Sequence, residues 1–235
     1  MDRTISGSRQ WWYPTLPRIA ALLATIMIAG LAVRVTNNRS LIEAIEAGDE
    51  ASVKALISAG ADVNAKNKYG VPALTEAVIV DRVDIVESLL SAGADVNSRY
   101  YDGLTPLMFA TYNSYKGTNR IEMVKALLAA GADVKLKSNH DLTALMHAVC
   151  GRGEQTDAVK VLIEAGSDVN ARYYDGRTVL MSAMLVGRVD TVRILLATGA
   201  DVDAKDYEGR TALKLAKEGN YIKIVQLLKA AGAKK

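Results

Sequence analysis

The stretch GADVNSRYYDGLTPLM occupies residues 93–108, and almost the same letters, GSDVNARYYDGRTVLM, return at residues 166–181. Variants of its first five letters place glycines at positions 60, 93, 131, 166, 199 and 232. Successive glycines are therefore separated by 33, 38, 35, 33 and 33 residues. A period near 33 residues that recurs along the chain indicates an array of stacked structural repeats.

Each period predicts two short helices. In DGLTPLMFA (102–110), the Thr105 hydroxyl can cap a helix, and Pro106 follows at the first helical position, where no backbone N–H is needed. The stretch IEMVKALLAAG (121–131) places apolar residues on one stripe of a second helix, and Gly131 is typical of a helix end. Neither helix can bury its apolar face alone, so we expect the pairs to stack.

These features resemble the ankyrin repeat family. The resemblance rests on the 33-residue period, on GLTPLMFA (103–110) as a variant of the family's T-P-L-H-x-A signature, and on the recurring GADVN. It covers residues 40–235, in units at about 40–63, 64–96, 97–134, 135–169, 170–202 and 203–235. It implies an all-α solenoid of helix-turn-helix units with β-hairpin-like tips. Asp141 replaces the usual turn glycine, which predicts a distorted tip at 138–142.

We expect one hydrophobic N-terminal helix before the repeats. A basic and aromatic leader (1–18) precedes residues 19–34, which are almost entirely uncharged and apolar. This segment fits an uncleaved signal anchor, the h-region of a cleaved signal peptide, or a buried core helix. The first alternative predicts a single-pass membrane protein with its repeats on the extracytoplasmic side. The second predicts a secreted or periplasmic protein. If the segment is retained, only VTNN (35–38) separates it from the repeats.

The charge distribution argues against nucleic acid as a partner. Residues 1–37 carry four arginines and one aspartate, which accounts for the whole net charge of +3. The remaining residues contain 25 basic and 25 acidic side chains, so the repeats have no net field to attract phosphates. The lone Cys150 excludes an intramolecular disulfide.

Residue patterns typical of enzymes are sparse. The two histidines are His140 and His147, and the second lies three residues before Cys150 on a predicted helix, a spacing that suits half of a metal site. Neighbouring units place Phe109, Ser182 and Leu215 at the position of His147, which favours an inward structural role instead. The chain shows no phosphate loop or nucleophile elbow. We therefore expect no enzymatic activity, no cofactor and no metal.

The family resemblance implies that a protein or peptide partner binds the concave side, which is formed by the tips and by the exposed face of the first helices. Tyrosine is common in interface hot spots because it offers broad contact at low entropic cost. The tip residues assigned to the partner are Tyr69, Tyr100, Tyr101, Asp102, Tyr173, Tyr174, Asp175 and Tyr207. The helix-face residues assigned to it are Ile79, Val80, Tyr112, Leu185 and Val186.

Two other interpretations of these residues stay open. Identical RYYDG letters can record duplication of the gene segment alone, and tip tyrosines can simply pack on the next tip. The apolar strip can also be covered by the chain's own N-terminal segment or by a second copy of the chain, and the second copy would make the protein a self-associating structural module. The insertion near 113–119 predicts a longer connection between two helices, away from the tips.

Overall fold

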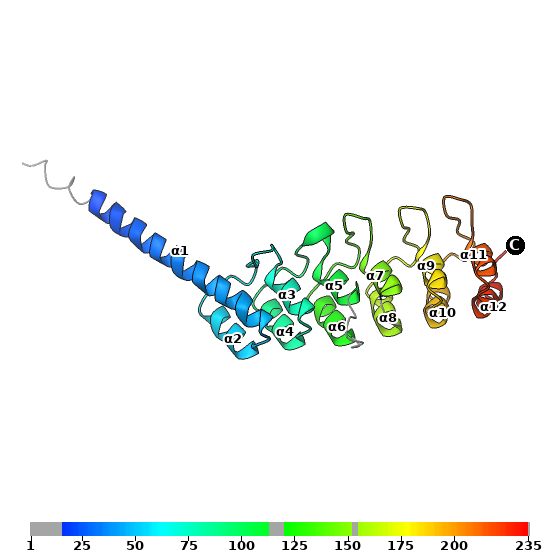
Figure 1. Ribbon diagram of the computed structural model, residues 1–235, viewed down its shortest axis with the longest axis horizontal. Helices are drawn as coiled ribbons and strands as arrows, with labels where there is room; N and C mark the ends of the chain where they lie inside the picture. The colour runs from blue at the N-terminus through cyan, green and yellow to red at the C-terminus, as the bar shows by residue number, and fades with distance from the viewer. Residues whose placement is uncertain (1–15, 113–119, 152–154, 235) are drawn as a thin grey trace, which may run out of the picture.

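The computed structural model describes residues 16–112, 120–151 and 155–234, which form helix pairs stacked in a single row (Figure 1). A long helix, α1 (Leu16–Glu46), pairs with α2 (Glu50–Ser58). Five further pairs follow: α3 (Ala73–Ile79) with α4 (Val83–Ser91), α5 (Pro106–Tyr112) with α6 (Ile121–Ala129), α7 (Ala144–Cys150) with α8 (Thr156–Glu164), α9 (Val179–Leu185) with α10 (Val189–Ala197), and α11 (Ala212–Glu218) with α12 (Ile222–Ala230). The predicted all-α solenoid is confirmed.

The predicted helix boundaries follow from local chemistry. The hydroxyls of Thr143, Thr178 and Thr211 each accept a hydrogen bond from the backbone N–H three residues later, at 3.3–3.4 Å. Such caps satisfy backbone donors that have no partner inside the helix. Gly131 follows α6 with φ 87°, a left-handed conformation that costs glycine little.

One continuous core runs the length of the stack. Leu107, Leu127, Leu145 and Leu162 are fully or almost fully buried, and they come from the first and second helices of neighbouring pairs. Burying a leucine side chain stabilises a fold by about 1.5–3 kcal/mol relative to leaving it exposed. Because each pair packs mainly on its neighbours, the core is built by stacking, as a solenoid requires.

The recurring asparagine of GADVN connects neighbouring units. The side-chain oxygens of Asn64, Asn97 and Asn170 accept the backbone N–H of the aspartate one unit further on, at 2.8–2.9 Å. In the unit at 135–169, Lys135 occupies the asparagine position. A lysine has no acceptor, so it cannot make this bond.

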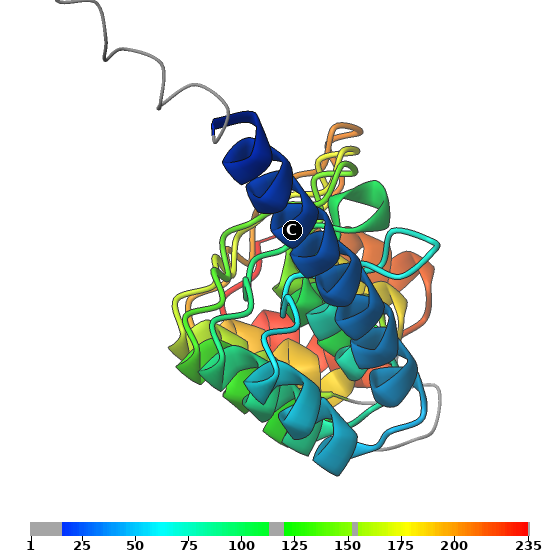
Figure 2. The same cartoon turned by 90° about the vertical axis from the view of Figure 1, so that its left-hand side faces the viewer.

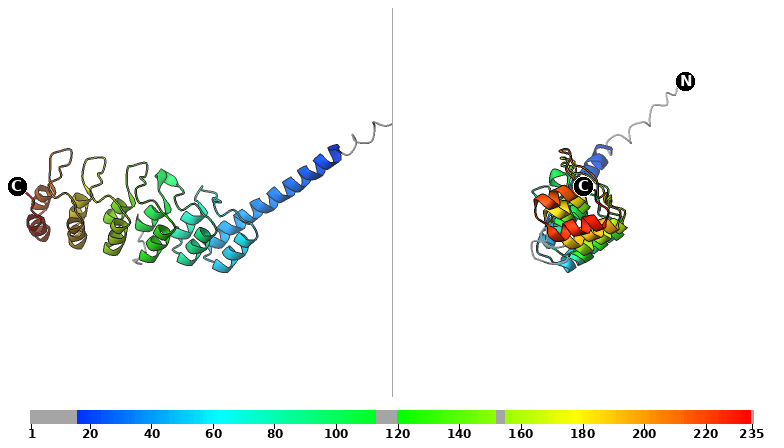
Figure 3. Two further views of the ribbon diagram at one scale, coloured as in Figure 1. Left: turned by 180° about the vertical axis from the view of Figure 1, so that it is seen from behind. Right: turned by 90° about the vertical axis from the view of Figure 1, so that its right-hand side faces the viewer.

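The hairpin-like loop that precedes each first helix is called a tip here. Tips 1 to 5 cover residues 66–72, 99–105, 137–143, 172–178 and 205–211, and they stand in a row along one side of the stack (Figure 3). Isolated antiparallel bridges close tips 1, 2, 4 and 5, and tip 2 also contains the short 3-10 helix η1 (Tyr101–Gly103). Tip 3 shows no such bridge among the described residues, and its Asp141 takes a left-handed φ of 60°.

The N-terminal region differs from the expected arrangement. VTNN (35–38) is not a linker, because α1 continues through it to Glu46 and buries Leu41 and Ile45 in the core. The rest of α1 projects beyond the stack (Figures 1 and 2). The predicted leader lies outside the described residues up to position 15. Over the described part of the chain, no helix combines the length and apolarity needed to cross a membrane, so the span expected at 19–34 has no support there.

Candidate functional site

The twin tyrosines of RYYDG point in different directions. The second residue of the tip, Tyr100 or Tyr173, is half-buried against first helices, whereas the third residue, Tyr101 or Tyr174, is exposed. The Tyr100 ring lies 6.1 Å from that of Phe109 on α5. The two members of each predicted pair therefore occupy different environments.

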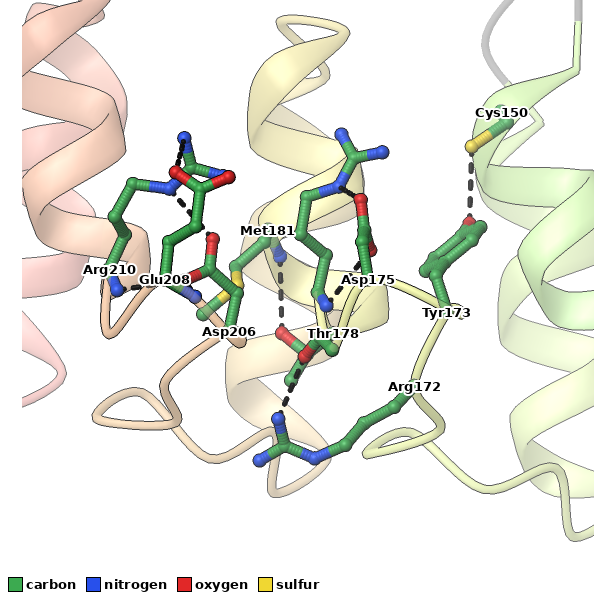
Figure 4. A network of polar contacts seen from close by, with 11 residues as sticks. Cys150, Arg172, Tyr173, Asp175, Thr178, Met181, Asp206, Glu208 and Arg210 are labelled. Carbon is green, nitrogen blue, oxygen red and sulfur yellow. Dashed lines mark hydrogen bonds and ion pairs between the residues drawn. The ribbon is translucent and has the colours of Figure 1, made fainter.

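Tyr173 is fixed by contacts with the preceding unit (Figure 4). Its hydroxyl lies 3.1 Å from the Cys150 Sγ and donates to the Met146 carbonyl at 3.4 Å, both on α7. Burial, with a smaller effect from Cys150, raises the pKa of the Tyr173 hydroxyl. The side chain therefore stays protonated and connects α7 with tip 4.

The exposed tyrosines share one place in the tips. Tyr101, Tyr174 and Tyr207 are each the third tip residue, and their exposed fractions are 70%, 78% and 77%. Tyr69, the fourth residue of tip 1, is 69% exposed, with the Lys68 Nζ 5.0 Å from its ring centre. Tyrosine offers a broad apolar face and a hydroxyl, and it is enriched in interface hot spots.

The arginine of RYYDG bridges consecutive tips. Arg172 donates to the carbonyl of Gly176 in its own tip at 2.8 Å and to that of Lys205 in tip 5 at 2.7 Å. Arg99 makes the equivalent bonds to Gly103 and Lys137, at 3.2 and 2.8 Å. The repeated letters therefore have a structural role, which is to join tip 2 to tip 3 and tip 4 to tip 5.

The glycine of RYYDG lets the next tip approach. A Cβ added at Gly176 would lie 2.5 Å from the Tyr207 ring, so this ring packs directly on the glycine. The Tyr207 backbone N–H donates to the Asp175 carbonyl at 3.2 Å, and Asn139 donates in the same way to Asp102 at 2.7 Å. Tyr207 is consequently held in place while its ring stays exposed.

The tip aspartates have partners within their own tip or in the next one. The Asp175 carboxylate accepts from Arg177 at 2.5 Å, and that of Asp206 accepts from Arg210 at 2.8 Å (Figure 4). Asp102 lies 3.6 Å from the His140 ring nitrogen. Burial acts to raise the pKa of Asp206, but hydrogen bonds from Arg210 outweigh it and hold that pKa below its usual value. The predicted site residues Asp102 and Asp175 therefore already have partners.

The helix-face residues form a strip behind the tips. Ile79, Tyr112 and Val186 are exposed to 40%, 52% and 48%, whereas Val80 and Leu185 are half-buried. The Tyr112 ring meets the His147 ring edge-on, with 5.4 Å between centres. The insertion at 113–119 lies outside the described residues.

His147 and Cys150 do not share an environment. His147 is buried, and this burial lowers its pKa to about 4, so the ring is neutral near pH 7. The Cys150 thiol is exposed and contacts Tyr173. Among the described residues, no group of three or more histidine, cysteine, aspartate or glutamate side chains could hold a metal ion.

Sequence reasoning missed a set of long polar side chains that precede the second helices. Each contacts the end of the first helix in the preceding unit. There it binds a backbone carbonyl near the helix end or, in one case, an aspartate side chain that follows the helix. Four of these side chains donate a hydrogen bond to a backbone carbonyl: Arg82 to Gly48, Gln155 to Thr111 at 2.9 Å, Arg188 to Ala148 at 3.1 Å and Tyr221 to Leu185 at 3.2 Å. The fifth, Arg120, forms an ion pair with Asp81 at 3.2 Å. The only signal was a bulky polar residue at one position of each unit.

Comparison with known proteins agrees with this architecture. The ankyrin repeat domain of Bcl-3, described as a unique member of the IkappaB protein family, is 28% identical with a TM-score of 0.74 over 83% of this chain and 86% of its own. An ankyrin repeat domain from Acinetobacter baumannii AYE is 31% identical with a TM-score of 0.75 over 83% of this chain and 98% of its own. No curated protein sequence matches the chain.

The family profile for ankyrin repeats (3 copies) matches residues 21–100, 41–138, 99–173 and 145–235. These overlapping matches cover every unit of the stack. Ankyrin repeats in general are non-enzymatic scaffolds for protein–protein interaction. The chain belongs to the ankyrin repeat family.

Proposed function

We propose that this chain is a non-enzymatic scaffold that recognises a protein or peptide on the surface formed by its tips and first-helix faces. The observation that carries the proposal is the exposure of Tyr101, Tyr174 and Tyr207 at one position of three tips. Inter-tip bonds hold these tips in place, so little conformational entropy is lost when a partner binds. Their broad faces and hydroxyls suit a protein surface.

The test is cross-linked affinity capture from native membranes and cytosol, with the full chain and with a Tyr101→Ala, Tyr174→Ala variant. We expect the variant to lose the partner, because both side chains lie on the surface and contribute little to the fold. Ile222→Ala on α12 is the control, since this side chain is also exposed, to 64%, but belongs to a second helix. Equal capture by the double variant would overturn the assignment of the tyrosines.

A second candidate function is self-association, which a feature of α1 favours. Met27, Leu31, Val33 and Val35 on this projecting helix are 59–74% exposed. Apolar side chains exposed along one helix usually have a partner. Light scattering across a concentration series would show a mass that rises with concentration if a second copy covers α1, and a constant monomer mass would remove this candidate.

The targeting role of residues 19–34 stays a prediction from sequence. We propose that this segment directs the chain to a membrane, as an anchor or as a cleaved signal, and that the repeats lie on the far side. The exposure of Leu31 and Val33 supports the proposal. Fractionation with N-terminal sequencing tests it: an intact chain in the membrane fraction supports the anchor, a shortened soluble chain supports the signal, and an intact soluble chain contradicts both.

A further inference from the structure

One end of the stack carries lysines where inner units bury apolar side chains. Met181 and Met184 on α9 are fully buried, and the residues 33 positions later, on α11, are the exposed Lys214 and Lys217. The apolar residues of α11, such as Leu213, are still buried. The two lysines therefore occupy the side of α11 that, in an inner unit, is covered by the following helix pair.

The second helix of this pair shows the same change. Leu196 on α10 is half-buried against the core, whereas Lys229, 33 residues later on α12, is exposed. Lys214, Lys217 and Lys229 are called the end face here. Another unit of the same kind stacked on them would bury three charges without partners, which is strongly unfavourable. The end face is therefore suited to water or to a partner of a different kind.

The end face belongs to the most basic unit of the repeats. Residues 203–235 contain eight basic and four acidic side chains, whereas residues 40–202 contain 16 basic and 21 acidic ones. Charge of one sign gathered at one end creates a local field, even though the repeats as a whole have almost no net charge. A polar cap that only keeps the stack soluble needs no such bias. The bias indicates an anionic partner.

The acidic side chains of this unit act mainly on its tip and loop. Asp206 and Glu208 pair with Arg210 in tip 5, at 2.8 and 2.9 Å. The hydrogen bond to Asp206 raises the pKa of the Arg210 guanidinium, with smaller contributions from Glu208 and Glu218. The Asp203 carboxylate accepts a backbone N–H at 2.9 Å. The positive charge of the end face is therefore not cancelled by these groups.

The three lysines of the end face take part in no ion pair within the part of the chain that the structure describes. Lysines on inner second helices differ in this respect. Lys125 and Lys160 each pair with an acidic side chain three residues earlier, at 3.0 and 3.7 Å. All three ammonium groups of the end face are consequently available to a partner.

We propose that the end face binds the surface of a lipid bilayer that contains anionic headgroups. Lysine carries a hydrated point charge on a flexible stem, which suits the diffuse charge of a headgroup layer, whereas arginine suits fixed bidentate contacts. The three lysines come from two helices that pack on each other, so they form a patch and not a line. A layer of anions can meet all three, whereas an extended acidic peptide follows a line. The end face is separate from the tip tyrosines, so this proposal does not rest on the proposed function.

The first experiment measures the reactivity of each lysine towards an amine-labelling reagent by mass spectrometry. The full chain is labelled alone, with vesicles of phosphatidylcholine, with vesicles of equal parts phosphatidylcholine and phosphatidylglycerol, and with oligoglutamate. We expect the mixed vesicles, and not the neutral ones, to protect the end-face lysines and to leave the exposed Lys66 and Lys135 reactive. No protection, or equal protection at all five lysines, would overturn the proposal. Equal or stronger protection by oligoglutamate would replace the bilayer with an acidic protein.

The second experiment compares affinities by vesicle sedimentation. Binding to neutral vesicles reports apolar contacts, such as those of α1, and serves as the baseline. Because a lysine close to an anionic bilayer strengthens binding about fivefold, we expect the full chain to bind mixed vesicles about 100-fold more tightly than neutral ones. This preference should disappear when all three end-face lysines are replaced by glutamine.

The control variant carries Lys66→Gln, Lys135→Gln and Lys160→Gln, which removes the same charge from scattered exposed sites and should keep the preference. The proposal is wrong if the unaltered chain binds both kinds of vesicle equally, or if the two variants show the same preference.

Discussion

At the scale of single residues, RYYDG has two separable roles. Arg172 and Gly176 fix the contact between tips 4 and 5, whereas Tyr174 extends into solvent. Tyr173 occupies the place where tip 5 has Asp206, and its ring packs on the preceding unit instead of closing its own tip. These contacts give Arg172, Tyr173, Asp175 and Gly176 structural roles that Tyr174 does not share.

The arginine bridge predicts a loss of stability in Arg99→Lys with Arg172→Lys. One nitrogen, Nη1, makes both bonds of each arginine, and the lysine side chain is one atom shorter, so the bond to the next tip should be lost. We expect the free energy of unfolding to fall by about 1 kcal/mol per site in urea denaturation. Arg193→Lys on α10, an exposed site, is the control. A double variant as stable as the control would contradict the bridging role.

The buried His147 predicts a pH dependence. Its pKa of about 4 lies below the ordinary value of 6.5, so the unfolded chain binds more protons between these values. Stability is therefore complete above pH 6.5 and decreases as the pH falls towards 4. We expect about 1 kcal/mol to be lost between pH 7.5 and 5.5, as measured by urea denaturation. In His147→Leu this contribution should vanish, and an unchanged pH slope in that variant would refute it.

At the scale of elements, the asparagine bonds connect most neighbouring loops, with an interruption at Lys135. Asn97 bonds to Asp133 and Asn170 bonds to Asp201, but the lysine has no acceptor for the backbone of Asp168. Lys137 also stands where tips 2 and 4 have a bridging arginine. The boundary between the units at 135–169 and 170–202 therefore lacks two connections that other boundaries have.

Lys135→Asn should strengthen this boundary. The new amide would accept the Asp168 backbone N–H, as its equivalents do, and raise the free energy of unfolding by about 1 kcal/mol. Thermal and urea denaturation measure the gain. Lys66→Asn, an exposed substitution in tip 1, should change stability by no more than about 0.5 kcal/mol. If Lys135→Asn behaves like this control, the missing bond is not what weakens the boundary.

The sequence predicted helices correctly where nearby residues alone set their ends. The threonine caps, the glycine ends and the stacked pairs follow from positions such as Thr178 and Gly131. The half-buried orientation of Tyr173 could not be predicted, because it depends on contacts with Cys150 and Met146 in the preceding unit. The continuation of α1 was missed for a similar reason, since Asn38 looks like a linker residue until its bond to the Asp62 backbone is known.

At the scale of the whole molecule, the fold is a single row of helix pairs whose tips carry exposed tyrosine side chains. Its core accounts for the stacking, and its inter-unit bonds account for the fixed order of the tips. The side chains of Tyr101 and Tyr174 contribute little to either. This separation of stability from exposure is what a binding scaffold needs.

The most direct test of that claim is a calorimetric titration of the captured partner into the full chain and into the Tyr101→Ala, Tyr174→Ala variant, with the melting temperature of both recorded. We predict at least about 100-fold weaker binding, because the two side chains act as interface hot spots. The melting temperature should change by no more than a few degrees, since both side chains are exposed. Equal affinity, or weaker binding that comes with a large fall in melting temperature, would contradict the account.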